Sequence, residues 1–295
     1  MIEEFLRKHG DYSNDKSFKD ITTIKMGGKI AHFVEPYNLN DLKEIIDFVK
    51  TNGVPFKVVG NGSNLIAGSS EFDGVVISLK HFDNYEISNN EVYVEAGVLA
   101  PYFASILANA GLSGFEFASG IPGCIGGLIY MNAGAYKKEM ADIVKEVKVL
   151  IKGEVVTLSN KELGFAYRHS ILKEHPHWIV ISCILSLENK DSEEIKELMN
   201  ERLQRRKDTQ PLDKPSAGSC FRNPDSNYAW KIVEDLGYRG YKLNGIEVSN
   251  KHANFIVNNG GGTSEDYLKI VYKIQEEALK KHNVKLIMEV EKFNC

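Results

Sequence analysis

The stretch Gly114–Tyr136 reads GFEFASGIPGCIGGLIYMNAGAY and carries no charged side chain between Glu116 and Lys137. Its glycines leave the backbone free to approach another molecule closely, which favours a large, flat and mostly neutral ligand. A tight connection between two strands is the alternative interpretation. The pattern differs from the dinucleotide fingerprint, whose glycines open a helix directly after the first strand of a βαβ unit. The glycines of the stretch are Gly120, Gly123, Gly126, Gly127 and Gly134, besides Gly114 itself.

A second glycine-rich stretch, Gly60–Asn64 (GNGSN), follows a short apolar segment at residues 56–59. Its glycines allow backbone N–H groups to converge on an anion, and Ser63 and Asn64 add side-chain donors. The lysine of a Walker loop is absent, which argues against a nucleoside triphosphatase. A β-turn without function is the alternative. One stretch suited to a pyrophosphate and one suited to a flat ring system together indicate a bound dinucleotide.

Composition narrows the class of protein. The chain has 295 residues, 43% of them hydrophobic, and its formal net charge of −4 argues against a nucleic-acid binder. No apolar run reaches the ~18 to 20 residues that span a bilayer, so we expect no membrane insertion. The absence of a signal-peptide pattern and of a Cys-x-x-Cys pair favours a cytoplasmic protein with reduced thiols. His175 and His177 lack neighbouring carboxylates or thiols, and no metal site is expected.

Hydrophobic periodicity predicts a mixed α+β fold. Pro211 and Pro215 break the chain after a helix with a basic end, and we expect a domain boundary there. Helices are expected at residues 2–9, 40–53, 101–110, 191–207, 228–236 and 263–282. Strands are expected at residues 31–34, 56–59, 74–79, 91–96, 143–151, 154–158, 178–187, 253–257 and 284–293.

Six motifs, in order, carry a resemblance to one enzyme family. With them the chain resembles the UDP-N-acetylenolpyruvoylglucosamine reductase family from about Ile21 to Val290, which composition and periodicity alone do not indicate. The motifs are GNGSN (60–64), GIPGCIGG (120–127), MNAGAY (131–136), YRHS (167–170), GSCF (218–221) and SxxHANF (249–255).

The resemblance implies a flavoenzyme of peptidoglycan precursor synthesis, and hence of cell wall biogenesis, cell shape and cell division. NADPH would reduce FAD, and the flavin would pass a hydride to the enolpyruvyl group of UDP-N-acetylglucosamine enolpyruvate, giving UDP-N-acetylmuramate. We expect noncovalent FAD, because the family holds it so and no histidine or cysteine lies in or beside residues 60–64. The expected partner is the UDP-sugar alone, and a monomer is expected.

The implied fold is a two-part FAD-binding domain of the vanillyl-alcohol-oxidase (PCMH) type followed by a C-terminal α+β substrate-binding domain. The subdomains would occupy residues 1–73 and 74–207, and the substrate domain residues 208–295, whose last strand could pack back toward the flavin. By resemblance, the pyrophosphate would lie near residues 60–64 and the ring near 118–127. The implied cofactor-binding residues are Gly60, Asn61, Gly62, Ser63, Asn64, Ala118, Ser119, Gly120, Gly123, Gly126, Gly127, Asn132 and Gly134.

Adding a hydride to the β-carbon of an enol ether carboxylate builds negative charge on the α-carbon and the carboxylate. The site therefore needs a cation or acid for the enolate and a proton donor for carbon. By resemblance, Arg168 would hold the carboxylate, Ser219 would donate the proton and Glu289 would stabilise the enol intermediate. Each has an ordinary alternative, as a surface arginine, a turn serine and a solvent-facing strand carboxylate.

The substrate carries a diphosphate, so its domain should be locally basic. Residues 202–251 hold ten Lys and Arg against six Asp and Glu, a balance of +4. The implied substrate contacts are Tyr167, Asn223, Lys231 and His252.

The chain departs from the usual family pattern at one residue and resembles one class of the family in the length of one interval. Glu291 stands where the family usually has an arginine after the Glu-Val step, which casts doubt on the packing of the strand end. The interval between Arg168 and Ser219 lacks a long tyrosine-bearing loop, as in the family's shorter class without that lid.

Two rival hypotheses stay open. A flavin-dependent oxidase or dehydrogenase of the same superfamily would be reoxidised by oxygen and would act on another small molecule. A nucleotide-sugar or flavin-binding regulator would have no need of a proton donor.

Overall fold

The computed structural model describes residues 2–225 and 227–295. The chain forms two compact units. Both units are discontinuous in sequence, whereas the expected domains, 1–73, 74–207 and 208–295, are continuous. Unit 1 comprises the residues up to Ser13, 32–61 and 74–204, and unit 2 comprises 14–31, 62–73 and 205–295. Within the described residues, no helix combines the length and apolar character that crossing a bilayer requires.

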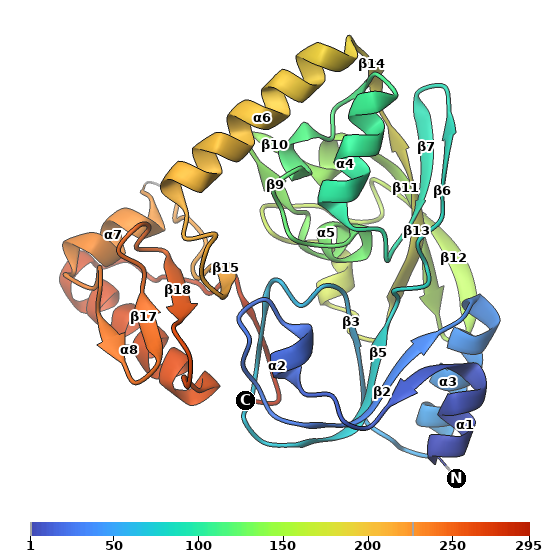
Figure 1. Cartoon of the computed structure of the whole chain (residues 1–295), viewed down its shortest axis with the longest axis horizontal. Coiled ribbons are helices and arrows are strands. Elements are labelled where there is room, and N and C mark those ends of the chain that lie inside the picture. The colour runs from blue at the N-terminus through green and yellow to red at the C-terminus, as the bar shows by residue number, and fades with distance from the viewer. Residues whose placement is uncertain (1, 226) are drawn as a thin grey trace. The chain divides into compact units, whose positions relative to one another are not determined.

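The first sheet of unit 1 has four strands in the order β1-β2-β5-β3 (Figure 1). β1 pairs antiparallel with β2, and β3 pairs parallel with β5. The predicted helix at 40–53 is confirmed: Asn38 caps it by accepting hydrogen bonds from two backbone N–H groups, and its apolar stripe is buried. The elements are α1 (Ile2–His9), β1 (Gly10–Ser13), β2 (Ile30–Pro36), α3 (Leu39–Thr51), β3 (Phe56–Val59) and β5 (Phe72–Ser78).

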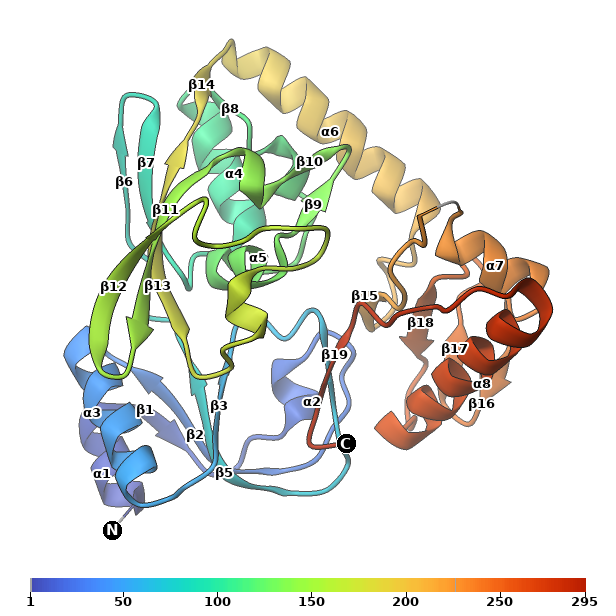
Figure 2. The ribbon, with the colours of Figure 1, turned by 180° about the vertical axis from the view of Figure 1, so that it is seen from behind.

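The second sheet of unit 1 has five antiparallel strands in the order β12-β11-β13-β7-β6. α5 packs on β13 and β7, and the apolar side chains of α4 and α5 join the same core as those of the sheet (Figure 2). The elements are β6 (Tyr85–Ser88), β7 (Glu91–Glu95), α4 (Ala100–Asn109), α5 (Ile125–Met131), β11 (Val144–Ile151), β12 (Glu154–Ser159) and β13 (Ile179–Ser186), followed by α6 (Ser192–Thr209).

The glycine-rich stretch Gly114–Tyr136 has more regular structure than the tight connection that its glycines suggest. A short 3-10 turn at Glu116–Ala118 leads through Gly120–Gly123 into α5, and the chain then enters the hairpin strand β9. α5 forms despite its two glycines because Ile125, Leu128 and Ile129 bury their side chains in the core of unit 1. The short strands here are β8 (Leu112–Ser113), β9 (Gly134–Ala135), β10 (Lys138–Glu139) and β14 (Glu188–Asn189); the remaining 3-10 turns are Met140–Asp142 and Ile171–Lys173.

Unit 2 is built on a four-stranded antiparallel sheet in the order β15-β18-β17-β16. Figure 1 shows α7 and α8 beside this sheet. Their apolar side chains form the core of the unit together with those of the sheet. A parallel pair, β4 with β19, joins residues 65–67 to residues 291–293 near the C-terminus. The elements are α2 (Phe18–Ile21), β4 (Leu65–Ala67), β15 (Ser216–Ser219), α7 (Ala229–Asp235), β16 (Lys242–Leu243), β17 (Ile246–Val248), β18 (Phe255–Asn258), α8 (Ser264–His282) and β19 (Glu291–Phe293).

The predicted strand at 284–293 is wrong for most of its length, since only β19 is regular strand. The expected alternation is real: Leu286 and Val290 are buried, while Lys285 and Ile287 are exposed. Residues 284–290 nevertheless find different partners one after another instead of one neighbouring strand, so no continuous ladder forms. The segment is extended, with a single antiparallel bridge between Phe221 and Met288.

Candidate functional site

Within unit 1, the first two residues of the 60–64 stretch contact the 120–127 stretch. The Asn61 side-chain amide donates a hydrogen bond of 2.8 Å to the Pro122 carbonyl. A Cβ atom on Gly60 would lie 2.5 Å from the Cys124 sulfur, so this position has room only for glycine unless that sulfur moves. Burial raises the pKa of the Cys124 thiol, although backbone N–H groups, including those of Gly127 and Asn61, oppose the shift. The thiol therefore stays protonated between the two stretches.

Several of the glycines face the protein's own backbone. A Cβ on Gly62, whose φ is +58°, would lie 2.1 Å from the Ile21 carbonyl oxygen. The same atom on Gly134 would lie 2.5 Å from the Lys138 carbonyl oxygen, inside the β9–β10 hairpin. The close approach expected at these positions is thus with the chain itself. Gly127 differs, because its nearest atom would be the Cys124 sulfur at 3.8 Å, an ordinary contact.

The residues of these stretches fit FAD. Glu116, the acid of the stretch, is buried and accepts hydrogen bonds from the Ser113 hydroxyl at 2.6 Å and the Gly114 N–H at 3.0 Å, so its carboxyl oxygens have partners within the stretch itself. Around Gly127 a Cβ would meet only the Cys124 sulfur, so the space beside this backbone could admit an uncharged group. Among the other expected cofactor residues, Ala118 and Gly123 are buried, and Ser119, Gly120, Gly126, Ser63 and Asn64 are half-buried.

Arg168 lies in a tight turn. Ala166 and His169 exchange backbone hydrogen bonds of 3.1 and 3.0 Å, which leaves Tyr167 and Arg168 as the two turn residues. Arg168 has a φ of +56°, which is uncommon outside glycine and asparagine. Its guanidinium donates to the Gly134 carbonyl at 2.8 Å and lies 5.1 Å from the centre of the Tyr167 ring.

The Asn132 side chain is hydrogen-bonded to this turn at Ala166. The side chain is fully buried, and its amide donates to the Ala166 carbonyl at 3.0 Å while its oxygen accepts from the Ala141 N–H at 2.9 Å. Its φ of +42° places Asn132 at the left-handed cap of α5. Asn132 and Gly134, which the resemblance predicts to bind the cofactor, contact the turn that carries Arg168: Asn132 bonds Ala166, and Gly134 accepts from the Arg168 guanidinium.

Ser219 and Glu289 lie on paired segments of unit 2. Ser219 is the last residue of β15, opposite Phe255 of β18. The next residue, Cys220, accepts a hydrogen bond of 2.8 Å at its carbonyl from the Glu289 N–H. The Glu289 carbonyl in turn accepts from the Asn64 side-chain amide at 3.1 Å. Glu289 itself is half-buried rather than solvent-facing.

Residue Glu291, which departs from the family pattern, lies in a regular strand and is hydrogen-bonded to the 60–64 loop. The Glu291 N–H donates to the Asn64 carbonyl at 2.9 Å, and the residue begins β19 opposite Leu65 of β4. Asn64 therefore bonds the C-terminal segment twice, once on each side of Val290.

Cys220 is a buried neighbour of the two expected catalytic residues. Burial raises the pKa of its thiol to about 12, a shift that the Tyr267 hydroxyl opposes and the Glu289 charge reinforces. The thiol is therefore neutral at physiological pH, and it supplies an apolar wall rather than a nucleophile.

His252 is the expected substrate residue with the most constrained side chain. Its Nδ1 accepts from the Asn254 N–H at 3.2 Å, which leaves Nε2 to carry the proton of the neutral ring. Burial, with the nearby Arg239 charge, lowers the pKa of His252. Phe255 and Trp230 lie against the ring, with centroids 5.0 and 6.5 Å away.

The remaining expected substrate contacts are exposed. Tyr167 is 47% exposed, and Lys231 lies on the exposed face of α7. Asn223 accepts a hydrogen bond of 3.0 Å from the Ala229 N–H, at the first residue of α7. Its side chain thus helps to start that helix.

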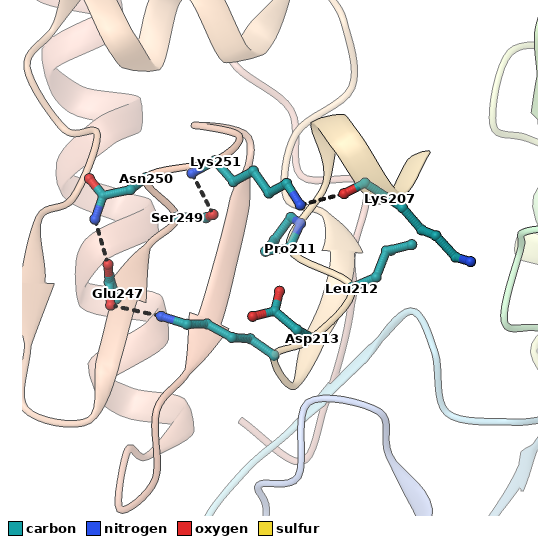
Figure 3. A pocket seen from close by; sticks show the side chains of 9 residues that line it. Lys207, Pro211, Leu212, Asp213, Glu247, Ser249, Asn250 and Lys251 are labelled. Atoms are coloured by element: carbon teal, nitrogen blue, oxygen red, sulfur yellow. Dashed lines mark hydrogen bonds and ion pairs between the residues drawn. The ribbon is translucent and has the colours of Figure 1, made fainter. Parts of the chain in front are cut away.

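A basic pocket of about 410 Å³ lies elsewhere in unit 2 (Figure 3). The Lys251 ammonium bonds the Lys207 carbonyl, and the Lys214 ammonium lies 3.4 Å from the Glu247 carboxylate. Glu247 is almost fully buried and is also 3.8 Å from the Lys242 ammonium, so two of the lysines counted in this region face a buried carboxylate. Neither Ser219 nor Glu289 lines the pocket, whose residues are Lys207, Pro211, Leu212, Asp213, Lys214, Glu247, Ser249, Asn250 and Lys251.

Sequence reasoning missed the residues that hold the site together. Asn254 belongs to the SxxHANF motif but was not predicted as a site residue. Its side chain bonds both the backbone N–H and the carbonyl of Phe221. A polar asparagine entering the apolar run at 253–257 was the available signal, because a buried amide requires hydrogen-bond partners.

Comparison with known proteins identifies the domains and the family of the chain. Residues 210–293 match the model described as UDP-N-acetylenolpyruvoylglucosamine reductase, C-terminal domain, and residues 30–159 match an FAD binding domain. A UDP-N-acetylenolpyruvoylglucosamine reductase of Caldanaerobacter subterraneus subsp. tengcongensis is 41% identical over 290 residues, covering 98% of this chain and 95% of that protein. One from Carboxydothermus hydrogenoformans is 42% identical over 272 residues, covering 92% of this chain and 90% of that protein.

A solved structure gives the same picture. The crystal structure of UDP-N-acetylenolpyruvylglucosamine reductase from Thermus caldophilus superposes with a TM-score of 0.83 at 33% identity, covering 96% of this chain and 98% of that chain. The predicted fold class, α+β with an FAD-binding domain and a C-terminal domain, is confirmed. On the identity and coverage of these relatives, the chain belongs to the UDP-N-acetylenolpyruvoylglucosamine reductase family.

Proposed function

We propose that this protein reduces the enolpyruvyl group of UDP-N-acetylglucosamine enolpyruvate to UDP-N-acetylmuramate, using NADPH and noncovalent FAD. One observation carries the proposal beyond family membership. The Glu289 N–H bonds the carbonyl of Cys220, the residue after Ser219, so the proposed acid and proton donor lie on hydrogen-bonded neighbouring segments. By the same proposal, the protein works in the cytoplasm, as a monomer, on a peptidoglycan precursor.

FAD, when bound, would accept a hydride from NADPH and deliver it to the β-carbon of the substrate's double bond. The residues proposed to hold it are those of the 60–64 and 118–127 stretches, which contact each other through Asn61 and Cys124. In sequence no cysteine lies beside Gly60, but in space Cys124 does. Because its thiol is buried and its pKa is raised, Cys124 is a poor nucleophile, which supports noncovalent binding.

Arg168 is proposed to bind the substrate carboxylate. A guanidinium is always charged, and its planar fork of donors matches a carboxylate. The bond to Gly134 and the contact with Tyr167 fix the orientation of this side chain. Arg168 thereby stabilises the charge that builds on the carboxylate as the double bond is reduced.

Ser219 is proposed to donate a proton to the α-carbon. The hydride and this proton together saturate the carbon–carbon bond, and the serine oxygen regains a proton from solvent afterwards. A serine hydroxyl is a weak acid, so its position must be fixed. Pairing of Ser219 with Phe255 and of Cys220 with Glu289 provides that constraint.

Glu289 is proposed to stabilise the enol intermediate. The carboxyl group needs a fixed position to act on charge that exists only transiently. Its backbone is held on both sides, by Cys220 and by Asn64.

We propose that the enzyme belongs to the class without a tyrosine lid. The interval between Arg168 and Ser219 is occupied by regular elements: a 3-10 turn, β13, β14, α6 and β15. These elements supply strands and a helix to the two units, which leaves little chain for an additional lid.

Steady-state turnover tests the proposed function. The purified protein should show a flavin spectrum, and NADPH consumption should depend on UDP-N-acetylglucosamine enolpyruvate. NADPH consumption that depends on oxygen and ignores the enolpyruvyl substrate would favour the rival oxidase. Bound flavin without any turnover would favour the regulator.

A further inference from the structure

We propose that Asn254 is a positioning residue for the chemical step. Its hydrogen bonds hold the segment after Ser219 in place where the β15–β18 ladder has ended, and this segment in turn holds Glu289. The inference rests on the proposed function. Asn254 is buried, with 4% of its surface exposed, so it acts through its neighbours.

The β15–β18 ladder ends at the pair of Ser219 with Phe255. Beyond that pair, the Cys220 N–H donates to the Asn254 backbone carbonyl at 2.7 Å. At the next residue, the Asn254 side chain supplies the hydrogen bonds in place of a backbone partner. Its oxygen accepts from the Phe221 N–H at 2.9 Å, and its amide donates to the Phe221 carbonyl at 2.8 Å. One residue thus makes three hydrogen bonds to the two residues that follow Ser219.

The other edge of the same segment holds Glu289. The Cys220 carbonyl accepts from the Glu289 N–H, and the Arg222 N–H donates to the Ile287 carbonyl at 2.9 Å. Residues 220–222 are therefore clamped between Asn254 on one edge and residues 287–289 on the other. A shift of this segment would move Ser219 through the chain and Glu289 through its hydrogen bond.

A side-chain amide of this length serves the role at any pH. Phe221 presents one donor and one acceptor, and an amide offers the complementary acceptor and donor in one plane. An ionised carboxylate would face the Phe221 carbonyl with like charge. An alanine would leave both buried Phe221 groups without partners.

Asn258, four residues along and the last residue of β18, is a matched control. It is similarly buried, and its amide donates to the Ile24 and Lys25 carbonyls at 3.0 and 3.2 Å while its oxygen accepts from the Gly260 N–H at 2.9 Å. Its loss should cost comparable stability without touching the Ser219 segment.

The experiment uses the full, FAD-loaded chain under anaerobic conditions. Flavin reduction by NADPH and flavin reoxidation by UDP-N-acetylglucosamine enolpyruvate are timed separately in wild type, Asn254→Ala and Asn258→Ala. We expect Asn254→Ala to keep the first rate and to lose about 100-fold in the second, the loss that a displacement of about 1 Å causes. Asn258→Ala should keep both rates.

Asn254→Asp adds a reversible test and covers the case in which the alanine variant fails to fold. A protonated carboxyl can both accept from the Phe221 N–H and donate to its carbonyl, so the reoxidation rate relative to wild type should rise as pH falls. The ratio to wild type is used because the ionisable groups near residue 254, namely Glu289, Cys220 and His252, are the same in both enzymes, so that their effects cancel.

Asn254 variants that reoxidise as fast as wild type, or whose two half-reactions fall equally, would overturn the inference. So would an Asn258→Ala enzyme with the same selective loss. A wild-type protein whose reduced flavin ignores the enolpyruvyl substrate would instead overturn the proposed function, and the two failures are therefore distinguishable.

Discussion

The Glu289 backbone N–H donates a hydrogen bond of 2.8 Å to the carbonyl of Cys220, and on its other side the Glu289 carbonyl accepts from Asn64. The C-terminal segment is thus tied both to the segment that carries Ser219 and to the expected pyrophosphate loop. This relationship explains how the motifs GNGSN and GSCF and the Glu-Val step, far apart in sequence, can serve one reaction.

Replacing Ser219 with alanine should separate the two half-reactions. We expect flavin reduction by NADPH to stay at the wild-type rate, whereas reoxidation by the enolpyruvyl substrate should fall by ~10² to 10⁴-fold, the usual contribution of a positioned proton donor. Stopped-flow absorbance of the flavin measures both rates. An equal loss in both would show that Ser219 has another role.

The Glu289 side chain can be removed without disturbing its backbone hydrogen bonds. Glu289→Gln keeps the shape but loses the acid, so reoxidation by substrate should slow by about 10² to 10³-fold. Glu291→Gln, two residues along and at the start of β19, is the control and should retain the wild-type rate. Similar rates in the two variants would count against an acid role for Glu289.

Arg168→Lys tests the fork of donors separately from the charge. Lysine keeps the positive charge but cannot bond the Gly134 carbonyl and a carboxylate in the same planar geometry. We expect KM for the enolpyruvyl substrate to rise about tenfold, equivalent to about 1.4 kcal/mol. An unchanged KM, measured by steady-state kinetics with saturating NADPH, would remove Arg168 from carboxylate binding.

Gly60→Ala should weaken FAD binding, because its Cβ would lie 2.5 Å from the Cys124 sulfur and push the two stretches apart. Removing the sulfur with Cys124→Ala should restore binding in the double variant, and flavin fluorescence during dilution measures the retention. If the double variant binds FAD no better than Gly60→Ala, the contact between the stretches is not what limits the site.

The lowered pKa of His252 makes stability depend on pH. The unfolded chain takes up a proton near the ordinary histidine pKa of about 6.5, whereas the folded ring resists it to lower pH. The unfolded state therefore binds more protons in that window, and the free energy of unfolding should fall as pH drops below about 6.5. Urea melts of His252→Gln should show a shallower fall, and an identical slope would contradict the buried, neutral ring.

Helices could be predicted from the sequence where the cap and the apolar stripe both lie within the same segment. The predicted helix at 263–282 forms because Thr263 caps it and its apolar stripe is buried. The segment after it was mistaken for a strand because alternation reveals one buried face and says nothing about the hydrogen-bond partner.

The candidate site was less accessible to sequence reasoning. The bond from Asn64 to Glu289 joins residues 225 positions apart, and the bonds from Asn254 to Phe221 join residues 33 apart. Such pairings depend on the whole fold, so the motifs named candidate residues without showing that the Asn132 side chain bonds Ala166 and the Asn254 side chain bonds Phe221.

Anaerobic single turnover tests the central claim most directly. The enzyme is first reduced with one equivalent of NADPH and then mixed with UDP-N-acetylglucosamine enolpyruvate, while flavin absorbance and product mass are followed. We predict that the flavin is reoxidised without oxygen and that UDP-N-acetylmuramate appears in equal amount. Flavin that stays reduced until oxygen is admitted, with no UDP-N-acetylmuramate formed, would contradict the account.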